Sequence, residues 1–249
     1  MTGPAPRRGP AERRASVQLP ADLKARGLRS RERLKRATRE LLNEQGFRSL
    51  RVQDVTGRAG VATGLFYRYF HDLREVVAEV SRDFFEELLA DTEPVKSHAH
   101  PYDWIFATLN NAVSRFADNP GILACLFGLA GDYEEFDEIW KSNAHRWNLG
   151  VADFLQREAG FGAARARRVG FLLGAMTEGV IYQALIRRTE DLMALGRRPE
   201  DTADALAVMW YRAIFLADPP VERLRAAGRR FVGVAPGPPR QARRRREES

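Results

Sequence analysis

The chain has 249 residues, of which 44% are hydrophobic and 29% charged, a composition typical of a folded globular protein rather than a disordered one. The longest apolar run, around residues 169–176, is shorter than the ~20 residues that a membrane span needs. Residues 1–14 lack the apolar segment of a secretory signal. The single cysteine, Cys125, cannot form an internal disulfide, so we expect a cytoplasmic protein that does not enter a membrane.

Positive charge gathers at the two ends of the chain. The net charge is +7, with +8 in residues 1–36 and +3 in residues 237–249, so the residues between them carry −4. Basic segments attract nucleic acid or anionic membranes by releasing counterions. We interpret residues 1–29 as a disordered basic arm and the better candidate for a DNA contact. We interpret residues 228–249 as a disordered basic tail. For this tail, contact with nucleic acid or membrane and simple solvation are equal alternatives.

The N-terminal part of the chain shows a long helix followed by two short ones. From Ser30, an apolar stripe at helical spacing runs through Leu34 to Leu42, and Gly46 ends it. Short segments at 52–59 and 63–70 are separated by Gly60. A longer amphipathic helix is expected over 74–90, and a loop with two prolines follows it. We therefore expect one domain over 30–80, with its last helix continuing to about 90.

A larger helical domain is expected over 91–227. Its apolar residues keep helical spacing, and Pro120, Gly160 and Pro199 punctuate the segments. The expected helices lie at about 102–118, 121–130, 134–159, 163–189, 200–217 and 221–227. Alternating strand patterns and internal repeats are absent from the sequence, so the expected fold class is all-α.

Two short helices joined by a tight glycine turn, behind a longer packing helix, are typical of the helix-turn-helix arrangement. The second short helix must enter a DNA major groove, so its outer face must be small or polar while its inner face packs firmly. The expected inner residues are Val61, Leu65, Phe66 and Phe70. The expected outward residues are Thr63, Gly64, Tyr67, Arg68, Tyr69 and His71. From Val55 to His71 there is no carboxylate, which suits a polyphosphate partner.

The segment around Ala59-Gly60-Val61 and Gly64-Leu65-Phe66-Tyr67-Arg68-Tyr69-Phe70 closely resembles the DNA-binding domain of the TetR family, over roughly residues 30–80. The resemblance implies that Tyr67 and Tyr69 contact phosphates, that Thr63, Gly64 and Arg68 lie at base edges or backbone, and that Gln53 approaches the backbone. With the outward His71, the candidate DNA-binding residues are Gln53, Thr63, Gly64, Tyr67, Arg68, Tyr69 and His71.

The segment departs from the family pattern at several positions. Ala62 stands where the family usually has a serine that caps the second short helix, so Thr63 is an alternative cap one residue later. Leu73 stands where a lysine typically begins the next helix, although Arg74 is adjacent. These departures leave the packing pattern intact and blur which residues contact bases.

Aromatic side chains recur on the helical faces of the larger domain, which suggests an elongated apolar cavity for a small apolar or amphipathic ligand. The TetR resemblance implies the same arrangement. A fainter similarity is to the subgroup that includes the mycobacterial repressor of ethionamide activation. It gives the candidate ligand-binding residues Trp104, Trp140, Trp147, Thr177, Tyr182 and Trp210. Glu178, a carboxylate in an apolar stretch, is expected either to orient a polar ligand group or to pair with an arginine across a dimer.

The last two long helices are expected to form a homodimer interface. Gly170, Gly174 and Gly179 permit close helix approach in the segment 163–189. The segment 200–217 carries an apolar face of Ala203, Leu206, Ala207, Trp210 and Ile214. A two-fold dimer would place its recognition helices about 34–36 Å apart, in successive major grooves of a pseudo-palindromic operator.

Signals for catalysis, metals and cofactors are weak. His98 and His100 lack a third ligand nearby, and Cys125 lies among apolar residues as a buried inert thiol would. We therefore expect that the protein is not an enzyme and that it binds neither a metal ion nor a cofactor. The TetR resemblance implies a repressor that a small apolar ligand releases from its operator, with activation as the alternative. A helical protein whose basic ends contact membrane or RNA, and an all-α enzyme, are the competing classes.

Overall fold

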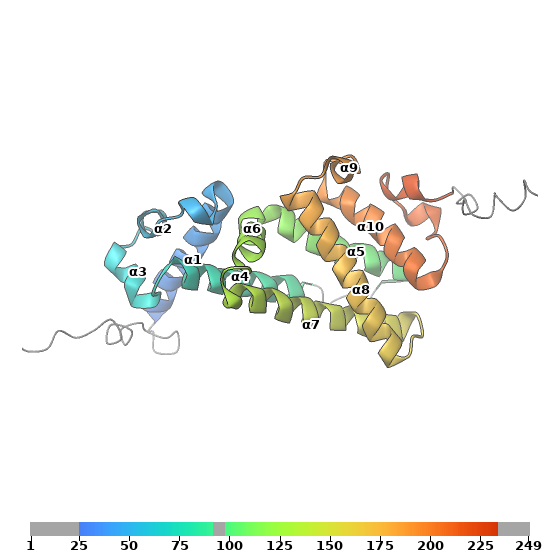
Figure 1. Ribbon diagram of the computed structural model, residues 1–249, viewed down its shortest axis with the longest axis horizontal. Helices are drawn as coiled ribbons and strands as arrows, with labels where there is room; N and C mark the ends of the chain where they lie inside the picture. The colour runs from blue at the N-terminus through green and yellow to red at the C-terminus, as the bar shows by residue number, and fades with distance from the viewer. Residues whose placement is uncertain (1–24, 92–97, 234–249) are drawn as a thin grey trace, which may run out of the picture.

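The computed structural model describes residues 25–91 and 98–233, and throughout these residues the secondary structure is helical, with turns and loops between the helices (Figure 1). The expected all-α class is thereby confirmed. A small domain containing α1 to α3 lies at one end of an elongated molecule, and α4 runs from it into a larger helical domain. Most of the expected arm and tail, residues 1–24 and 234–249, lie outside the described residues.

The small domain consists of α1 (Ala25–Gln45), α2 (Val52–Ala59) and α3 (Thr63–Tyr69), with α4 (Leu73–Ala90) leading out of it. These bounds agree with the sequence-based helices, except that α1 starts earlier. Residues 25–29, assigned from sequence to the basic arm, belong to this helix. Leu34, Ala37, Leu41 and Leu42 are buried, as their spacing predicts, and they belong to the same core as Val55 and Phe66.

The larger domain contains α5 (Pro101–Asp118), α6 (Pro120–Leu129), α7 (Glu134–Glu158), α8 (Ala163–Ile181) and α10 (Pro199–Phe215). α7 packs along α8, and α5 packs along α10. A π-helical turn, Tyr182–Ile186, continues α8, and the chain then turns at Arg188, which has a φ of 51°. The short α9 (Glu190–Met193) follows, where the sequence pattern had extended the preceding helix to 189.

The segment Ala163–Ile186 is long and apolar enough to cross a membrane by length and composition, with a mean hydropathy of 1.5 over its most apolar window. The longest uninterrupted apolar run, residues 169–176, covers only part of this longer segment and so did not identify it. This helix packs against α7 and also contacts α5, as a helix in a bundle does. A third of the apolar window is buried, and Leu172 is 71% exposed on its open face. An apolar face of this kind is typical of a surface that another protein covers.

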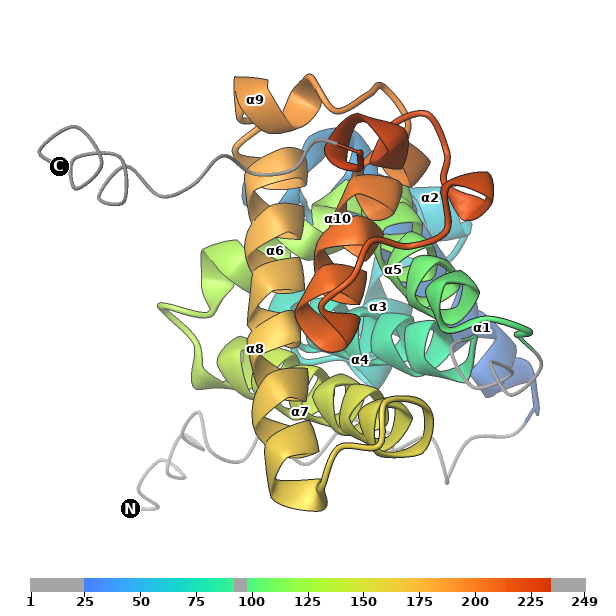
Figure 2. The same ribbon diagram turned by 90° about the vertical axis from the view of Figure 1, so that its right-hand side faces the viewer.

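The apolar stripe of α10 faces the interior of its own subunit. Ala203, Leu206, Ala207, Trp210 and Ile214 are all buried, and α10 packs against α5 and the turn Gly228–Phe231. The prediction that this stripe meets a second subunit is therefore wrong. Figure 2 looks onto the side of the molecule where α8 and α10 lie, with the C-terminal turns beside α10. The exposed part of α10 is instead its outer edge, including Ala213, and Leu216 just beyond its end.

A buried carboxylate fixes the C-terminal segment against α10 and α5. Asp204 is fully buried and accepts hydrogen bonds from the Tyr102 hydroxyl at 2.8 Å and from the backbone N–H groups of Gly228 at 2.5 Å and Arg225 at 3.3 Å. Burial and this carboxylate raise the pKa of Tyr102 far above its ordinary value. Residues 228–233, assigned from sequence to a disordered tail, include the turn Gly228–Phe231.

The two domains meet where the start of α6 approaches α1. The Asn43 side chain accepts a hydrogen bond from the Gly121 N–H at 2.9 Å, and Arg39 donates to the Asn119 side chain at 2.8 Å. A Cβ atom on Gly121 would lie 2.2 Å from the backbone oxygen of Leu42. The absence of a side chain at this position therefore permits the two helices to touch.

Candidate DNA interface and ligand chambers

Gly60 makes the turn between α2 and α3 possible. It ends α2 with a φ of 62°, in the left-handed region that favours glycine. Phe66 and Phe70 are fully buried, and Val61 and Leu65 pack partly buried against the same core. All four residues expected to form the inner face of the second short helix therefore face inward, which holds α3 rigidly on α1 and α2.

The outer surface of α2 and α3 presents most of the expected DNA-binding residues. Tyr67 is 52% exposed. The others on this surface are also exposed: Gln53, Thr63, Gly64, Arg68 and His71. Tyr69 is the exception, because it is only 4% exposed and belongs to the core with Phe66 and Phe70. The prediction that Tyr69 faces outward is wrong. Residues 66, 69 and 70 share one side of a helix, so helical spacing already contained this signal.

A carboxylate side chain caps the start of α4, whereas no side chain caps the start of α3. Ala62 precedes α3 without capping it, and the Thr63 hydroxyl lies 3.4 Å from the Thr56 hydroxyl, so the expected replacement cap does not form. At the start of α4, the Asp72 carboxylate accepts a hydrogen bond from the Glu75 N–H at 3.0 Å. The Glu75 side chain accepts from the His71 N–H at 2.5 Å, which fixes the end of α3 to α4.

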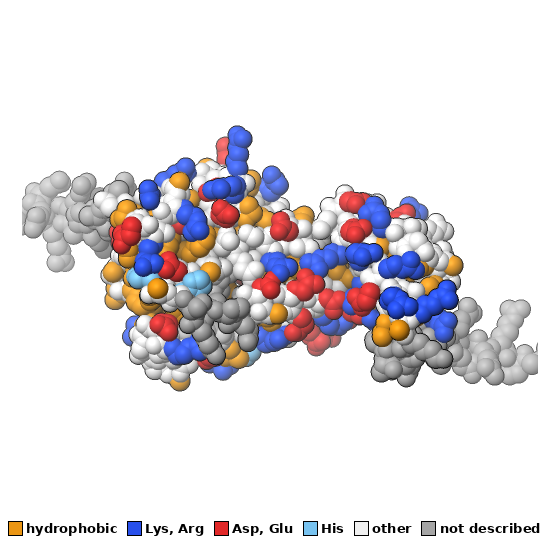
Figure 3. Space-filling view, turned by 180° about the vertical axis from the view of Figure 1, so that it is seen from behind, with side chains coloured by type: hydrophobic (Ala, Val, Ile, Leu, Met, Phe, Trp, Pro, Cys, Tyr) orange, Lys and Arg blue, Asp and Glu red, His pale blue; other side chains and the backbone are white. Residues whose placement is uncertain are grey.

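Ion pairs within the protein already engage several basic side chains of the small domain. Arg58 on α2 pairs with Glu44 at 2.7 Å and with Glu40 at 3.3 Å. Arg31 is buried, pairs with Glu79 on α4, and lies 4.8 Å from the centre of the Phe70 ring. Figure 3 shows Lys and Arg side chains at the helix-turn-helix end of the back face, with acidic and basic side chains mixed over the middle. Arg31 and Arg58 are thus engaged by acidic side chains of the same domain in this structure.

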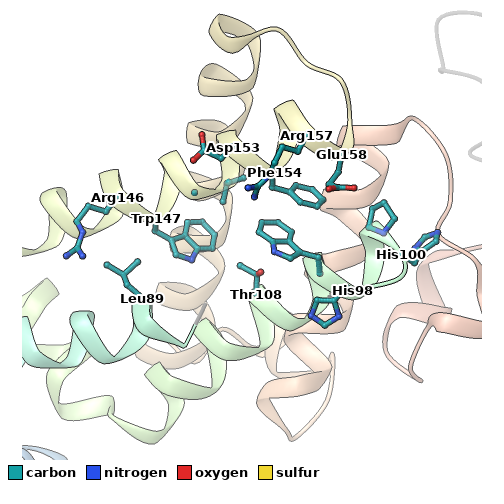
Figure 4. Close-up of a pocket in the computed structure, with 14 residues that line it drawn as sticks. Leu89, His98, His100, Thr108, Arg146, Trp147, Asp153, Phe154, Arg157 and Glu158 are labelled. Carbon is teal, nitrogen blue, oxygen red and sulfur yellow. The ribbon is translucent and has the colours of Figure 1, made fainter. Parts of the chain in front are cut away.

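A large cavity of about 680 Å³, which we call the outer chamber, lies between α5, α7 and the end of α4. Trp104 stacks on Phe154 with ring centres 3.8 Å apart, and Leu89, Thr108 and Trp147 point into the same space (Figure 4). The Thr108 hydroxyl is buried without a hydrogen-bond partner. His98, His100, Arg157 and Glu158 also line this chamber, so it combines an aromatic floor with polar side chains.

A smaller cavity of about 60 Å³, the inner chamber, lies between α4, α5, α7 and α8. It shares Trp147 and Leu89 with the outer chamber. The Trp140 indole N–H donates to the Glu178 carboxylate at 2.9 Å. Burial raises the pKa of the Glu178 carboxyl above its ordinary value, and this hydrogen bond opposes the shift.

Four of the six expected ligand-binding residues line the chambers. Trp104 lines the outer chamber, Trp140 and Thr177 the inner one, and Trp147 both. Trp210 is fully buried with its ring centre 5.6 Å from that of Trp147, and Tyr182 packs 4.9 Å from Phe127, so neither lines a chamber.

Sequence reasoning had not placed several other lining residues. Phe154 could have been found because positions 140, 147, 151 and 154 share one face of α7. Thr108 and Asn148 carry no comparable signal, since only the packing of neighbouring helices shows that a buried polar side chain meets a cavity.

The remaining reactive side chains have structural surroundings. The His100 ring nitrogen accepts the Tyr102 N–H at 3.1 Å and so caps α5. Burial raises the pKa of the Cys125 thiol to about 12, which confirms the expected inert cysteine. Within residues 25–91 and 98–233, no cluster of three or more His, Cys, Asp or Glu side chains is arranged to hold a metal ion.

Comparisons with known proteins agree with this architecture. Residues 34–80 match the family described as bacterial regulatory proteins, tetR family. The chain is 31% identical over 71 residues to the uncharacterized HTH-type transcriptional regulator YdgC of Bacillus subtilis (strain 168); the match covers 28% of this chain and 36% of that protein.

Similar solved structures extend the likeness to the whole fold. One is a transcriptional regulator from Rhodococcus sp. Rha1, with 25% identity and a TM-score of 0.61 over 77% of this chain and 99% of that chain. Another is a transcriptional regulator from Aquifex aeolicus VF5, with 18% identity and a TM-score of 0.55 over 72% of this chain and 99% of that chain. These relatives are described as regulators and not as enzymes. The helix-turn-helix segment of the chain, residues 34–80, is thus that of the tetR family of bacterial regulatory proteins, and the fold around it is similar to that of solved transcriptional regulators.

Proposed function

We propose that this protein is a homodimeric transcriptional repressor that binds a pseudo-palindromic operator and leaves it when a small apolar or amphipathic ligand occupies the chambers. The outer surface of α2 and α3 carries this proposal. It presents exposed polar side chains, including Tyr67, on a short helix whose inner aromatic residues are fully buried. No carboxylate lies between Val55 and His71, so nothing in that segment repels phosphate.

The exposed face of α8 supports dimer formation. Leu172, Ala175 and Gly179 are exposed along this face, and Leu216 beyond α10 is 88% exposed. Burial of apolar surface favours association, and small residues let helices approach closely. Two such faces related by a two-fold axis would leave both copies of α3 on the outside of the dimer.

The position of α4 supports a link between ligand and DNA. Its N-terminal end is tied to α3 through His71 and Glu75, while Phe85, Leu88 and Leu89 near its other end line the chambers. A ligand that displaces α7 or α8 from these residues would tilt α4 and change the separation of the two recognition helices. Release requires the ligand to favour the non-binding state by a few kcal/mol, in the sense of a population shift.

Selection of bound fragments from a genomic DNA library tests this function. We expect the wild-type protein to enrich an inverted repeat, and Tyr67→Ala and Arg68→Ala to lose that enrichment. Arg165→Ala is the charge-matched control, because Arg165 is exposed at the start of α8, far along the chain from α3. Enrichment that survives in Tyr67→Ala, or binding that is salt-sensitive but without any preferred sequence, would contradict the proposal.

A further inference from the structure

The inner chamber contains a carboxylate without a cationic partner. Glu178 is the one charged side chain among the residues that line it, and the lining includes no lysine, arginine or histidine. Among the described residues, the Trp140 indole N–H is the sole hydrogen-bond partner of this carboxylate. One carboxylate oxygen is thus left to accept a further hydrogen bond.

A half-buried carboxylate in such surroundings is costly unless a cation or further donors reach it. Its raised pKa reflects that cost. The Asn148 side-chain oxygen is a second acceptor lining the chamber; it is buried and has no hydrogen-bond partner. The lining groups that lack a partner are therefore acceptors, and a ligand would complement them by donating hydrogen bonds.

Aromatic side chains line the same chamber as the carboxylate: Phe85, Phe116, Trp140 and Trp147. The Trp140 ring centre lies 5.9 Å from that of Phe85 and 6.0 Å from that of Phe116. The faces of such rings attract cations, and they attract them more strongly where water is excluded. Carboxylate and rings together favour a positively charged group over a neutral or negative one.

The two chambers differ in size, so they would hold different parts of a ligand: a small head group in the inner chamber and a larger body in the outer one. A volume of 60 Å³ holds a small group such as an ammonium but no aromatic ring. The outer chamber, at 680 Å³, has the size of a typical ligand site, and the stacked Trp104 and Phe154 rings offer it a flat apolar surface. Trp147 and Leu89 line both chambers, so the two cavities adjoin at these side chains.

We propose that the ligand is an amphipathic amine whose protonated nitrogen binds Glu178 in the inner chamber, while its apolar body lies in the outer chamber against Trp104 and Trp147. The inference rests on the proposed ligand-binding role of this domain. It adds the sign of the ligand's charge, the end of the molecule that carries it, and Glu178 as the residue that selects it.

Three probes of one shape test the charge preference: 4-phenylbutylamine, 4-phenylbutan-1-ol and 4-phenylbutyrate. Binding is followed without DNA through tryptophan fluorescence, because all four tryptophans of the chain, Trp104, Trp140, Trp147 and Trp210, lie in or beside the chambers. We expect the amine to bind about tenfold more tightly than the alcohol, as a charge-assisted hydrogen bond would give, and the acid to bind most weakly. Glu178→Gln keeps the acceptor for Trp140 and should reduce the preference for the amine to within about twofold of the alcohol.

Glu190→Gln is the matched control, since Glu190 is an exposed acid at the start of α9 that lines neither chamber and its substitution changes the charge by the same amount. It should retain the preference for the amine. Tightest binding of the acid, equal loss of all three probes in Glu178→Gln, or no quenching by the amine at millimolar concentration would overturn the inference. A change of oligomeric state in Glu178→Gln with unchanged amine binding would also overturn it and place Glu178 at the dimer interface.

The same samples separate this inference from the function on which it rests. If the amine binds through Glu178 but leaves DNA affinity unchanged, the ligand class holds and release by ligand fails. If no sequence-specific DNA binding is found, the regulator function fails whatever the probes show. DNA binding without any amine binding leaves the regulator function standing and overturns the ligand class.

Discussion

The DNA-binding domain and the larger domain differ in how completely their buried polar atoms are satisfied. Among the described residues, buried side-chain atoms without a hydrogen-bond partner occur once in the small domain, at Arg31, and four times in the larger domain, at Thr108, Asn110, Asn148 and Trp210. Both chambers also lie in the larger domain. A buried polar atom without a partner is costly unless water or another molecule supplies one. Two of the four in the larger domain, Thr108 and Asn148, line the chambers, where the proposed ligand would meet them. The small domain instead packs α3 firmly on α1 and α2.

The largest expected effect on stability distinguishes substitution of Phe66 from substitution of its neighbour Tyr67 in α3. Phe66→Ala should lower the free energy of unfolding by about 3–5 kcal/mol, because it leaves a cavity in the fully buried core. Tyr67→Ala should change it by less than about 0.5 kcal/mol, since Tyr67 is largely exposed, yet it should lose operator binding. Urea denaturation and DNA titration measure the two quantities. Loss of stability in Tyr67→Ala would show that this residue serves packing.

Within the larger domain, the buried Asp204 carboxylate has hydrogen-bond partners, unlike the four buried atoms named above. Asp204→Ala should lower the free energy of unfolding by about 2–4 kcal/mol, because the Tyr102 hydroxyl and two backbone N–H groups lose their buried acceptor. Asp191→Ala, at an exposed position in α9, is the control and should have no effect on urea denaturation. An unchanged stability in Asp204→Ala would mean that the segment after α10 contributes little to the fold.

Two glycines of α6 test the contact between the domains. Gly121→Ala should lower stability by about 1–3 kcal/mol, because its Cβ would lie 2.2 Å from a backbone oxygen of α1 that cannot move independently. Gly128→Ala on the same helix meets no atom within 4 Å and should leave stability unchanged or raise it by up to about 1 kcal/mol. Equal effects of the two substitutions in thermal denaturation would contradict the close packing of α6 on α1.

The smallest expected effect on stability is an increase rather than a decrease. Glu178→Gln should raise the melting temperature of the ligand-free protein by a few degrees at neutral pH, because the carboxylate is held where its pKa is raised. A raised pKa means that wild-type stability is fully present below the ordinary glutamate value and is lost as pH rises through the folded value. The difference between the two proteins should therefore close as the pH is lowered.

Melting curves at several pH values measure this difference, with Glu158→Gln, at an exposed position lining the outer chamber, as the control. A wild-type protein that melts above Glu178→Gln at neutral pH would mean that the charge already has a partner.

Helical periodicity predicted the elements well because each helix buries one stripe, as Leu34 to Leu42 in α1 show. It did not identify what covers a stripe: the apolar face of α10 is covered by α5 and the C-terminal turn of its own chain rather than by a second subunit. For Trp210 the sequence shows an aromatic residue on an apolar face, and only the three-dimensional packing shows that it backs the chambers without lining them. The π-helical end of α8 and the short α9 have no periodic signal of sufficient length.

The most direct test of the central claim compares the affinity of the protein for an enriched inverted repeat with its affinity for a duplex of equal length that holds one half-site. We predict that two chains bind each full repeat, and that the half-site duplex binds much more weakly at the same salt concentration. Equal affinity for both duplexes and for unrelated DNA, with a steep loss at higher salt, would contradict the account. The basic ends of the chain would then be responsible for the binding, and the face of α3 would not read DNA.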